Sequence, residues 1–513
     1  MARILVSYFR SDEVSVNETL CFFDSFFKEL TDCGNDVLAI NNAYYGIFNP
    51  NRTNNLEVRD YLLKEAIKFD PELIITFNHR ILQEILDEFE DIPVVIYDGD
   101  ELRFFSDLDV IKENINRYKV FSIVENWRKD YLDFGFKDNQ IFYLPPGTSV
   151  KKDSEVVPTM NISFLGQRRF FLSSKLKNCI QEGRDIDKIY NMYLDFLKTH
   201  DYSYENIYRR NMAYNSDVSL SDADLWPLFD QSYLIFANLL DLGLHLGGHE
   251  AGWRDIVDFI PQIATVHSKA RVFTLEENQN FYNSSILSLC PMHPQAQGKG
   301  YSWRCYDIMA SNACLVPSYS SELKREIKEY VDLPMFNTPQ EARDICKKLL
   351  DDEPYRKSLV EASQHFIEDN GRWIDRIRKM ENILNMKLIF ENKKGELKKL
   401  VWHPAEWDAR IPQRVTIVED SPMAMKEQII SLGDRIQRVI INPLLLVTLF
   451  IAVLLNGSVL WALKYGMFDS ILNSGFIMFF SYAFAFLTIA FIIALEGCII
   501  YKFAYRVIRK ILA

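Results

Sequence analysis

The chain has 513 residues, of which 25% are charged and 13% aromatic, so it is long enough for two or three domains and too apolar to be disordered. Its formal net charge of -12, without a Lys/Arg-rich run among aromatic residues, excludes a general nucleic-acid binder. The eight cysteines include no CxxC pair, which argues against a structural zinc site or a disulfide framework and favours reduced thiols in the cytosol.

Short apolar runs alternate with helical patterns in residues 1–150. This alternation predicts a doubly wound parallel sheet, a Rossmann-like α/β domain, because buried parallel strands are joined by crossover helices. The chain opens with MARILVSYFR, which lacks the long apolar stretch of a signal peptide, so we expect this domain in the cytoplasm. The predicted strands are residues 3–8, 36–40, 73–77, 93–97, 120–124 and 140–144.

A second Rossmann-like domain is predicted over residues 158–390, after a PPGTS linker at 145–149. It opens with the strand MNISFL, and a helical insertion over about 175–235 separates this strand from the rest of the α/β pattern. Later strands are expected at 242–253, 270–274, 285–291 and 313–318, and two amphipathic helices at 341–385. Ligands of open α/β sheets bind beyond the carboxyl ends of the strands, so we expect the active site in a cleft between the two domains.

Two long uncharged stretches near the C-terminus predict a transmembrane hairpin over 439–501. Residues 439–463 and 475–495 each reach the roughly 20 apolar residues that a helix needs to cross a bilayer. Lys and Arg residues precede the first stretch and follow the second, which predicts cytoplasmic termini at an inner membrane. A charged linker with a juxtamembrane helix is expected at 391–438, and a basic cytoplasmic tail at 502–513. The alternative is a buried hairpin in a soluble core.

Several cofactor-binding motifs are absent from the sequence. No GxGxxG turn follows the first strand, where SYFRSDE stands, which disfavours a nicotinamide or flavin enzyme. There is no GxxxxGK[ST] and no HExxH, which disfavours a P-loop nucleotidase and a zinc hydrolase. His245 and His249 are four residues apart, but the glycines beside them disfavour a ligand-bearing helix. We therefore expect no cofactor and assign no metal site.

The stretch 283–318 has the pattern strand, glycine-containing loop, helix and strand. Glycine lets a ligand approach the backbone of the loop, and a helix N-terminus beside Lys299 and Arg304 suits a diphosphate. Asp307 follows Arg304 by one helical turn, where a carboxylate can accept hydrogen bonds from a ribose. The alternative is a surface Arg–Asp pair beside an ordinary loop. The candidate residues of this stretch are Lys299, Gly300, Ser302, where the helix is predicted to begin, Arg304 and Asp307.

This stretch resembles the donor-binding segment of the GT-B glycosyltransferases, glycosyl transferases group 1, and more narrowly their CgeB-like branch. Ser302, Arg304 and Tyr306 stand at the places of an S-x-R-x-[FY] motif. FLG at 164–166 resembles the domain-opening strand and turn of this family, and GGHEAGW, which ends at Trp253, resembles its G-x-G-W loop. The resemblance covers roughly residues 70 to 385.

The resemblance implies a GT-B fold, in which the first domain lies on the acceptor side and the second binds a nucleotide-diphosphate sugar. It implies that Arg304 contacts the donor phosphate and Asp307 the ribose. Gly166, with Arg168 in the same loop, and Gly248 would let the donor approach the backbone. Relatives carry an E-x7-E pair, but here Lys299 takes the first place and Asp307 the second, so the stereochemical outcome stays open.

Glycosyl transfer needs a group that accepts the proton of the acceptor hydroxyl, and such groups are expected at the carboxyl ends of strands. The polar residues at these positions are His79, Asp98, Asp100 and Glu101 in the first domain and His249 and Glu250 in the second. We take Asp100, His79 and His249 as the catalytic candidates. The alternatives are that Asp98 and Asp100 belong to an ordinary turn and that His79 caps a helix.

The sequence thus predicts a glycosyltransferase that transfers a sugar from a nucleotide-diphosphate sugar to a lipid-linked or membrane-proximal acceptor in surface glycan synthesis. Its expected partners are the sugar donor, this acceptor and the membrane, and not nucleic acid. The alternative is a non-catalytic nucleotide-sugar-binding scaffold of a membrane assembly, which the missing first glutamate of E-x7-E favours. A transporter is disfavoured, because two apolar spans with few polar residues offer no path.

Overall fold

The computed structural model describes residues 1–10, 13, 16–42, 56–105, 107–166, 232–248, 253, 261–268, 271–292 and 299–401. The predicted insertion up to residue 231, the juxtamembrane helix, the transmembrane hairpin and the basic tail lie outside these residues. Within the described ranges, no helix has the length and apolarity needed to cross a membrane. The described residues all belong to one compact unit, Met1–Thr416.

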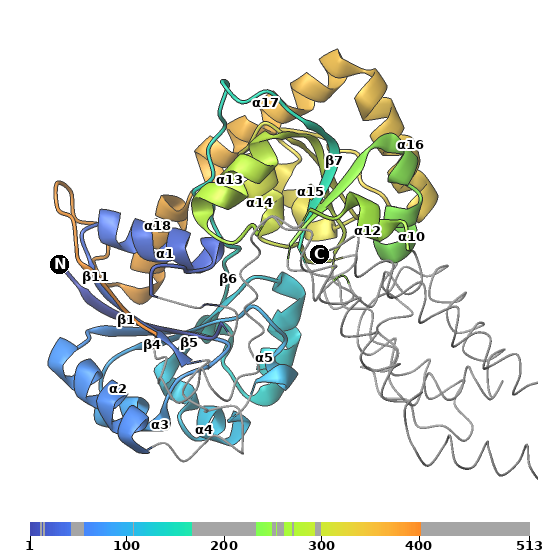
Figure 1. The fold of residues 1–513 in the computed structure, drawn as a ribbon. Helices are drawn as coiled ribbons and strands as arrows, with labels where there is room; N and C mark the ends of the chain where they lie inside the picture. Colours follow the sequence, from blue (N-terminus) through green and yellow to red (C-terminus); the bar gives the residue numbers. More distant parts are fainter. Residues whose placement is uncertain are drawn as a thin grey trace, which may run out of the picture. The chain divides into compact units, whose positions relative to one another are not determined.

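The first domain is built on a seven-stranded sheet in the order β11-β2-β1-β3-β4-β5-β6, with all neighbours parallel (Figure 1). Alternate residues of each strand enter different cores: Leu5 and Ile74 lie on one face, and Ile4 and Ile75 on the other. Both faces are therefore apolar, as expected for a parallel sheet covered by helices on two sides. The strands are β1 (Arg3–Tyr8), β2 (Asp36–Asn41), β3 (Leu73–Phe77), β4 (Val94–Tyr97), β5 (Tyr118–Ser122), β6 (Ile141–Tyr143) and β11 (Leu397–Leu400).

Helices cover both faces of this sheet. Phe26 and Phe27 of α1 pack with Trp373 and Ile377 of α18 on one face, and Figure 1 shows these two helices side by side. The helices of the opposite face place apolar side chains in the other core. The helices of this domain are α1 (Cys21–Asp32), α2 (Leu56–Phe69), α3 (Gln83–Glu88), α4 (Leu108–Glu113), α5 (Arg128–Phe134) and α18 (Trp373–Leu384).

The second domain is built on a four-stranded parallel sheet in the order β10-β9-β7-β8. Its strands are β7 (Met160–Leu165), β8 (Leu244–Gly247), β9 (Ser285–Cys290) and β10 (Cys314–Pro317). Its helices are α10 (Ser232–Ala237), α12 (Ile263–Val266), α13 (Leu275–Asn283), α14 (Arg304–Met309), α15 (Ser321–Ile327), α16 (Pro339–Asp351) and α17 (Glu353–Asn370). Two parallel sheets in tandem confirm the predicted two-domain α/β architecture.

The chain returns to the first domain after α17, which differs from the predicted boundary at residue 390. Helix α18 packs in the core of the first domain, and β11 pairs with β2 at the edge of its sheet. The predicted linker 391–438 therefore begins with a strand of the first sheet. Two smaller corrections concern the second domain: residues 271–274 form no strand, and the region 341–385 contains parts of three helices rather than two.

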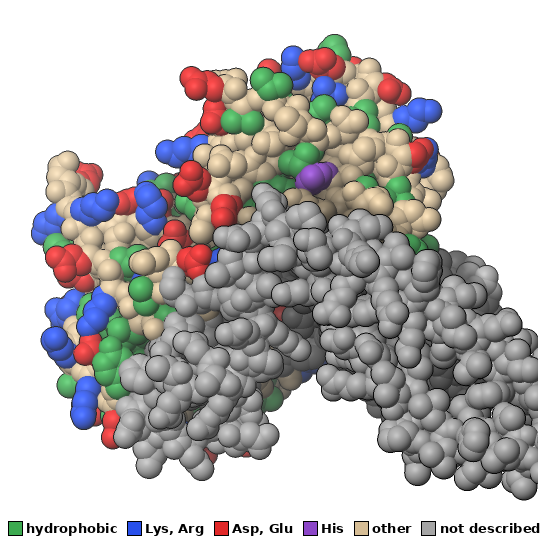
Figure 2. Space-filling model, viewed as in Figure 1, with side chains coloured by type: hydrophobic (Ala, Val, Ile, Leu, Met, Phe, Trp, Pro, Cys, Tyr) green, Lys and Arg blue, Asp and Glu red, His purple; other side chains and the backbone are tan. Residues whose placement is uncertain are grey.

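Charges of both signs are interspersed over the described surface on the face seen in Figure 2. Ion pairs such as Lys28–Asp32 and Arg343–Asp241 join exposed side chains at 2.5 and 2.6 Å. Exposed pairs of this kind contribute about 0.2–1 kcal/mol each, so the apolar cores rather than these pairs hold the domains together.

Candidate active site

Two glycine turns touch at the carboxyl end of the second sheet. Gly166 follows β7 and Gly248 follows β8, and both have positive φ values, 153° and 114°, which favour glycine. A Cβ on Gly248 would overlap the carbonyl oxygen of Gly166, so the turns meet through their backbones. The imidazole of His267 lies 2.9 Å from the carbonyl oxygen of Gly248. The structure thus brings these two predicted donor-binding residues together.

Arg304 lies beside the glycine turns. It is the first residue of α14, two positions after the predicted helix start at Ser302. A Cβ on Gly166 would come 3.3 Å from its Nη2, and its Nη1 lies 3.4 Å from the hydroxyl of Ser302. The side chain is half-buried, and among the described residues it forms no ion pair with a carboxylate. A guanidinium in this position at the carboxyl edge of a parallel sheet suits a phosphate group.

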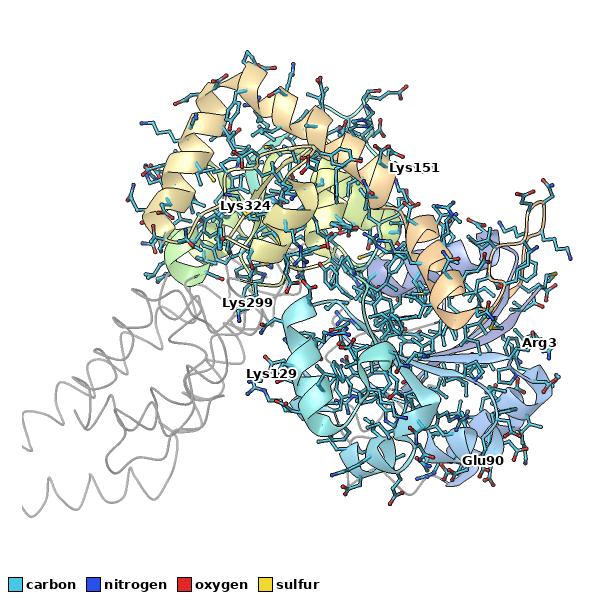
Figure 3. The ribbon with its side chains drawn as sticks, turned by 180° about the vertical axis from the view of Figure 1, so that it is seen from behind. Arg3, Glu90, Lys129, Lys151, Lys299 and Lys324 are labelled. Carbon is cyan, nitrogen blue, oxygen red and sulfur yellow. The ribbon has the colours of Figure 1, made fainter. Side chains whose placement is uncertain are left out.

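Lys299 and Gly300 contact the first domain. The ammonium of Lys299 donates to Asn126 Oδ1 at 3.0 Å, and Figure 3 shows Lys299 near α5. A Cβ on Gly300 would come 2.5 Å from a methyl group of Val124, so a larger residue would not fit. Glu322, at the start of α15, accepts hydrogen bonds of 3.2 and 3.3 Å from two backbone N–H groups of the first domain. The loop predicted to bind the donor therefore also joins the two domains.

Asp307, which was predicted to contact a ribose, is buried in the structure. Its side chain is 6% exposed, and both carboxylate oxygens accept hydrogen bonds within the protein. Thr148 Oγ1 donates to Oδ1 at 2.5 Å, and Asn278 Nδ2 donates to Oδ2 at 2.9 Å. Burial raises the pKa of Asp307 to about 6, and these two hydrogen bonds and Arg304 lower it in part. The predicted contact with a ribose does not fit this position.

Asp100 is the predicted catalytic residue of the first domain with an exposed side chain. Asn78, directly after β3, donates to Asp100 Oδ2 at 2.8 Å. The amide oxygen of Asn78 also accepts from the backbone N–H groups of Gly99 and Asp100, at 2.6 and 3.2 Å. One side chain thus fixes both the backbone and the carboxylate of this turn. Asn78 was not among the predicted site residues, although its place directly after a buried strand was a usable indication.

His79 is buried, which does not fit its predicted role as a catalytic base. The imidazole is 1% exposed, and its Nε2 lies 3.0 Å from the hydroxyl of Tyr118. Burial lowers the pKa of His79 to about 4, so the ring is neutral near pH 7. We therefore assign His79 to the packing of the first domain.

Asp98 and Glu101 are also held within the first domain. Asp98 is 1% exposed and accepts hydrogen bonds from Tyr131 Oη and the Ile123 N–H, both at 2.8 Å. Glu101 pairs with Arg103 at 2.6 Å. Burial raises the pKa of each of these two carboxyl groups to about 7. Of the carboxylates in the YDGDE segment, Asp100 alone is exposed in the structure.

The remaining predicted site residues, Arg168 and His249, lie outside the described residues, as does Glu250. Among the residues that the structure does describe, no group of three or more His, Cys, Asp or Glu side chains could hold a metal ion. The predicted roles of Arg168 and His249 stay predictions.

Residues 233–382, from α10 into α18, match a family described as glycosyl transferase-like. This segment is therefore similar to glycosyltransferases in sequence. The match includes Gly248 and Arg304, and it confirms the predicted resemblance to glycosyltransferases and the predicted enzyme class, while the narrower resemblance to the CgeB-like branch stays a prediction. No curated protein matches the sequence of the chain.

Solved glycosyltransferase structures are similar to the chain at low sequence identity. HepE of Anabaena, in complex with UDP and glucose, is 11% identical with a TM-score of 0.45, covering 75% of this chain and 99% of that one. Sucrose-phosphate synthase of Thermosynechococcus elongatus is 10% identical with a TM-score of 0.46, covering 75% and 98%. BGT of phage T4, in complex with UDP-glucose, is 12% identical with a TM-score of 0.36, covering 75% and 100%. At these values the similarity assigns no substrate and no residue role to this chain.

Proposed function

We propose that the protein transfers a sugar from a nucleotide-diphosphate sugar to an acceptor hydroxyl. The observation that carries this proposal is the half-buried guanidinium of Arg304 beside the touching turns of Gly166 and Gly248. A diphosphate is bound by cations and by backbone groups, and this edge of the second sheet places a guanidinium beside two glycine turns. The family match over residues 233–382 supports the same assignment.

In the proposed reaction, the acceptor hydroxyl attacks the anomeric carbon of the donor, the bond from this carbon to the diphosphate oxygen breaks, and the nucleoside diphosphate leaves. Arg304 binds the departing diphosphate and stabilises the negative charge that develops on it. Asp100, which follows β4, accepts the proton of the hydroxyl, because its carboxylate is exposed and is held in place by a hydrogen bond from Asn78.

The proposed acceptor is lipid-linked or membrane-proximal and belongs to the synthesis of a surface glycan. Support comes from the two uncharged stretches 439–463 and 475–495, which are long enough to span a bilayer, and from the Lys and Arg residues on their flanks. Such a hairpin would hold the enzyme at the inner membrane with both termini in the cytoplasm. The proposal fails if full-length protein in vesicles uses a water-soluble acceptor as well as a lipid-linked one.

Thermal stabilisation of the full-length protein in detergent tests the donor site. The panel contains nucleoside diphosphates and nucleotide sugars, with UDP and UDP-glucose included because the similar solved structures hold them. A ligand at 100 times its dissociation constant adds about 2.7 kcal/mol, which gives a measurable shift. We expect Arg304→Ala to abolish the shift and Arg343→Ala, which removes an exposed guanidinium paired with Asp241, to retain it.

The second candidate is a non-catalytic nucleotide-sugar-binding scaffold of a membrane assembly. The observation in its favour is Lys299, which stands at the first place of the E-x7-E pair and binds Asn126 in the structure. Donor hydrolysis without acceptor, measured as release of nucleoside diphosphate, separates the two candidates. Release that Arg304→Ala abolishes supports the enzyme, and binding without any release supports the scaffold.

A further inference from the structure

The two segments that cross between the domains are in direct contact. The first crossing contains Gly147 and Thr148, and the second contains Arg372 and Trp373. The N–H of Thr148 donates to the carbonyl oxygen of Gly371 at 3.0 Å. A Cβ on Gly147 would lie 2.6 Å from the backbone N and Cα of Trp373, so the two crossings leave no room for a side chain there. Together the two crossings form the covalent connection between the domains, the interdomain hinge.

One side chain of the second domain binds this hinge. Asp307 Oδ1 accepts a hydrogen bond from the hydroxyl of Thr148, and Arg372 extends to the carbonyl oxygen of Val150 at 2.5 Å. Thr148 and Asp307 are 2% and 6% exposed, so water does not compete strongly for this hydrogen bond. Asp307 is therefore fixed to the hinge rather than available to a ligand.

The same carboxylate also binds α13. Asn278 Nδ2 donates to Asp307 Oδ2, and Phe273, just before α13, accepts a 2.9 Å hydrogen bond from the N–H of Cys21 in the first domain. Asp307 thus connects the hinge to a segment that contacts the first domain at a second place. It lies one helical turn after Arg304 on α14, so a shift of Asp307 changes the position of the Arg304 guanidinium.

We propose that Asp307 is a positioning residue, which couples the interdomain hinge at Thr148 to the donor-binding Arg304. This inference rests on the proposed function in naming Arg304 as a donor ligand. It replaces the direct contact with ribose that the sequence predicts for Asp307. The hydrogen bonds of the two carboxylate oxygens fix the orientation of α14. Domain movement at the hinge would therefore shift the guanidinium of Arg304 relative to the diphosphate.

The test is Thr148→Val, which keeps the shape of the side chain and removes two hydrogen bonds, the one that Thr148 donates to Asp307 and the one that it accepts from the N–H of Val150 at 3.1 Å. We expect the donor KM of the full-length protein to rise about tenfold, because hydrogen bonds to charged groups are among the stronger ones. We expect kcat to change much less, and Thr148→Ser, which keeps the hydroxyl, to restore the KM.

Thr338→Val is the matched control. Thr338 caps α16, accepts a hydrogen bond from the N–H of Glu341, and lies in neither the hinge nor the donor site. It should lower the melting temperature without changing the donor KM. Equal donor KM values for Thr148→Val and the wild type would overturn the proposal.

Hydrogen exchange provides a readout that needs no turnover, so failure of this inference can be told from failure of the proposed function. Thr148→Val should speed exchange of the α14 amides, and Thr338→Val only that of the α16 amides. If the wild type turns over no nucleotide sugar, the proposed function fails, while faster exchange in α14 still supports the coupling. Unchanged exchange in α14 would overturn the coupling whatever the activity.

Discussion

The guanidinium of Arg304 lies against the backbone of Gly166, so closely that a Cβ on Gly166 would come within 3.3 Å of its Nη2. The two residues are far apart in the chain and belong to different loops at the carboxyl edge of the second sheet. This pairing of a cation with a backbone turn is the part of the molecule that we propose to bind the diphosphate.

Gly166→Ala should weaken donor binding. The added methyl group would lie 3.1 Å from Phe164 and 3.3 Å from Arg304, and φ at this position is 153°, which strains any other residue. Overpacking costs about 1–3 kcal/mol, and displacement of Arg304 is the easiest relief, so we expect the donor KM to rise at least about tenfold. Steady-state kinetics with varied donor measure this effect.

Gly135→Ala serves as the control for strain alone. Gly135 also has a positive φ, 123°, but it ends α5 in the first domain, and its Cβ would make only an ordinary contact of 3.5 Å with Ile115. It should lower stability and leave the donor KM unchanged. The same rise in donor KM for both variants would contradict the role given to Gly166.

Asp100→Asn and His79→Asn should separate the two described catalytic candidates of the first domain. Because Asp100 is exposed and held by Asn78, its substitution should lower kcat about 10²-fold with little loss of stability. Because His79 is 1% exposed and contacts Tyr118, its substitution should lower the melting temperature and leave kcat unchanged. Single-turnover rates and thermal unfolding measure both effects, and the reverse pattern would return His79 to the active site.

The strands of both sheets could largely be predicted, whereas the last strand could not. Buried parallel strands are continuous apolar runs, and the predicted strand at 73–77 coincides with β3. The β11 sequence LKKL contains two lysines, since this edge strand is partly exposed and Lys398 and Lys399 pair with Glu65 and Asp24. Its partner β2 lies more than 350 residues earlier, so no local pattern indicates the pairing.

The candidate site also has a part that could be predicted from the sequence and a part that could not. Whereas their contact with a donor stays a prediction, the grouping of Gly166, Gly248 and Arg304 could be predicted from motifs, because tight glycine turns restrict residue type locally. The position of Asp307 could not, because it is decided by a hydrogen bond to Thr148, 159 residues away. A carboxylate one turn after an arginine has the same local pattern whether it faces a ligand or a buried hydroxyl.

Gly395→Ala should detach β11 from the first sheet. A Cβ on Gly395 would overlap the carbonyl oxygen of Asn35, just before β2, and its N–H donates to Thr31 at 2.9 Å. We expect a loss of about 1–3 kcal/mol in the free energy of unfolding and faster hydrogen exchange along β2. Gly99→Ala is the control, since its Cβ would make an ordinary 3.6 Å contact. Equal stability of the two variants would contradict the pairing of β11.

Asp98→Asn should change how the stability of the first domain depends on pH. Burial raises the pKa of Asp98 to about 7, against about 3.9 for an aspartate in an unfolded chain. At pH values between these two pKa values, the carboxyl group of Asp98 is protonated in the folded protein and ionised in the unfolded chain. The contribution of Asp98 to the free energy of unfolding is therefore greatest below about pH 4 and is lost as the pH rises to about 7.

Urea unfolding of the wild type and of Asp98→Asn at several pH values between 5 and 8 measures this contribution. As the pH rises towards 7, the free energy of unfolding of Asp98→Asn should increase relative to that of the wild type by up to about 1.4 kcal/mol per pH unit. Above pH 7 the difference between the two proteins should stay constant. Burial lowers the pKa of His79 to about 4, so between pH 5 and pH 8 His79 takes up a proton only in the unfolded chain; this contribution is the same in both proteins and cancels in the difference. Asp109→Asn, on the exposed surface of α4, controls for the loss of one charge. A difference that stays constant from pH 5 to pH 8 would mean that Asp98 is already ionised in the folded protein, and that its hydrogen bonds from Tyr131 and Ile123 outweigh the cost of burial.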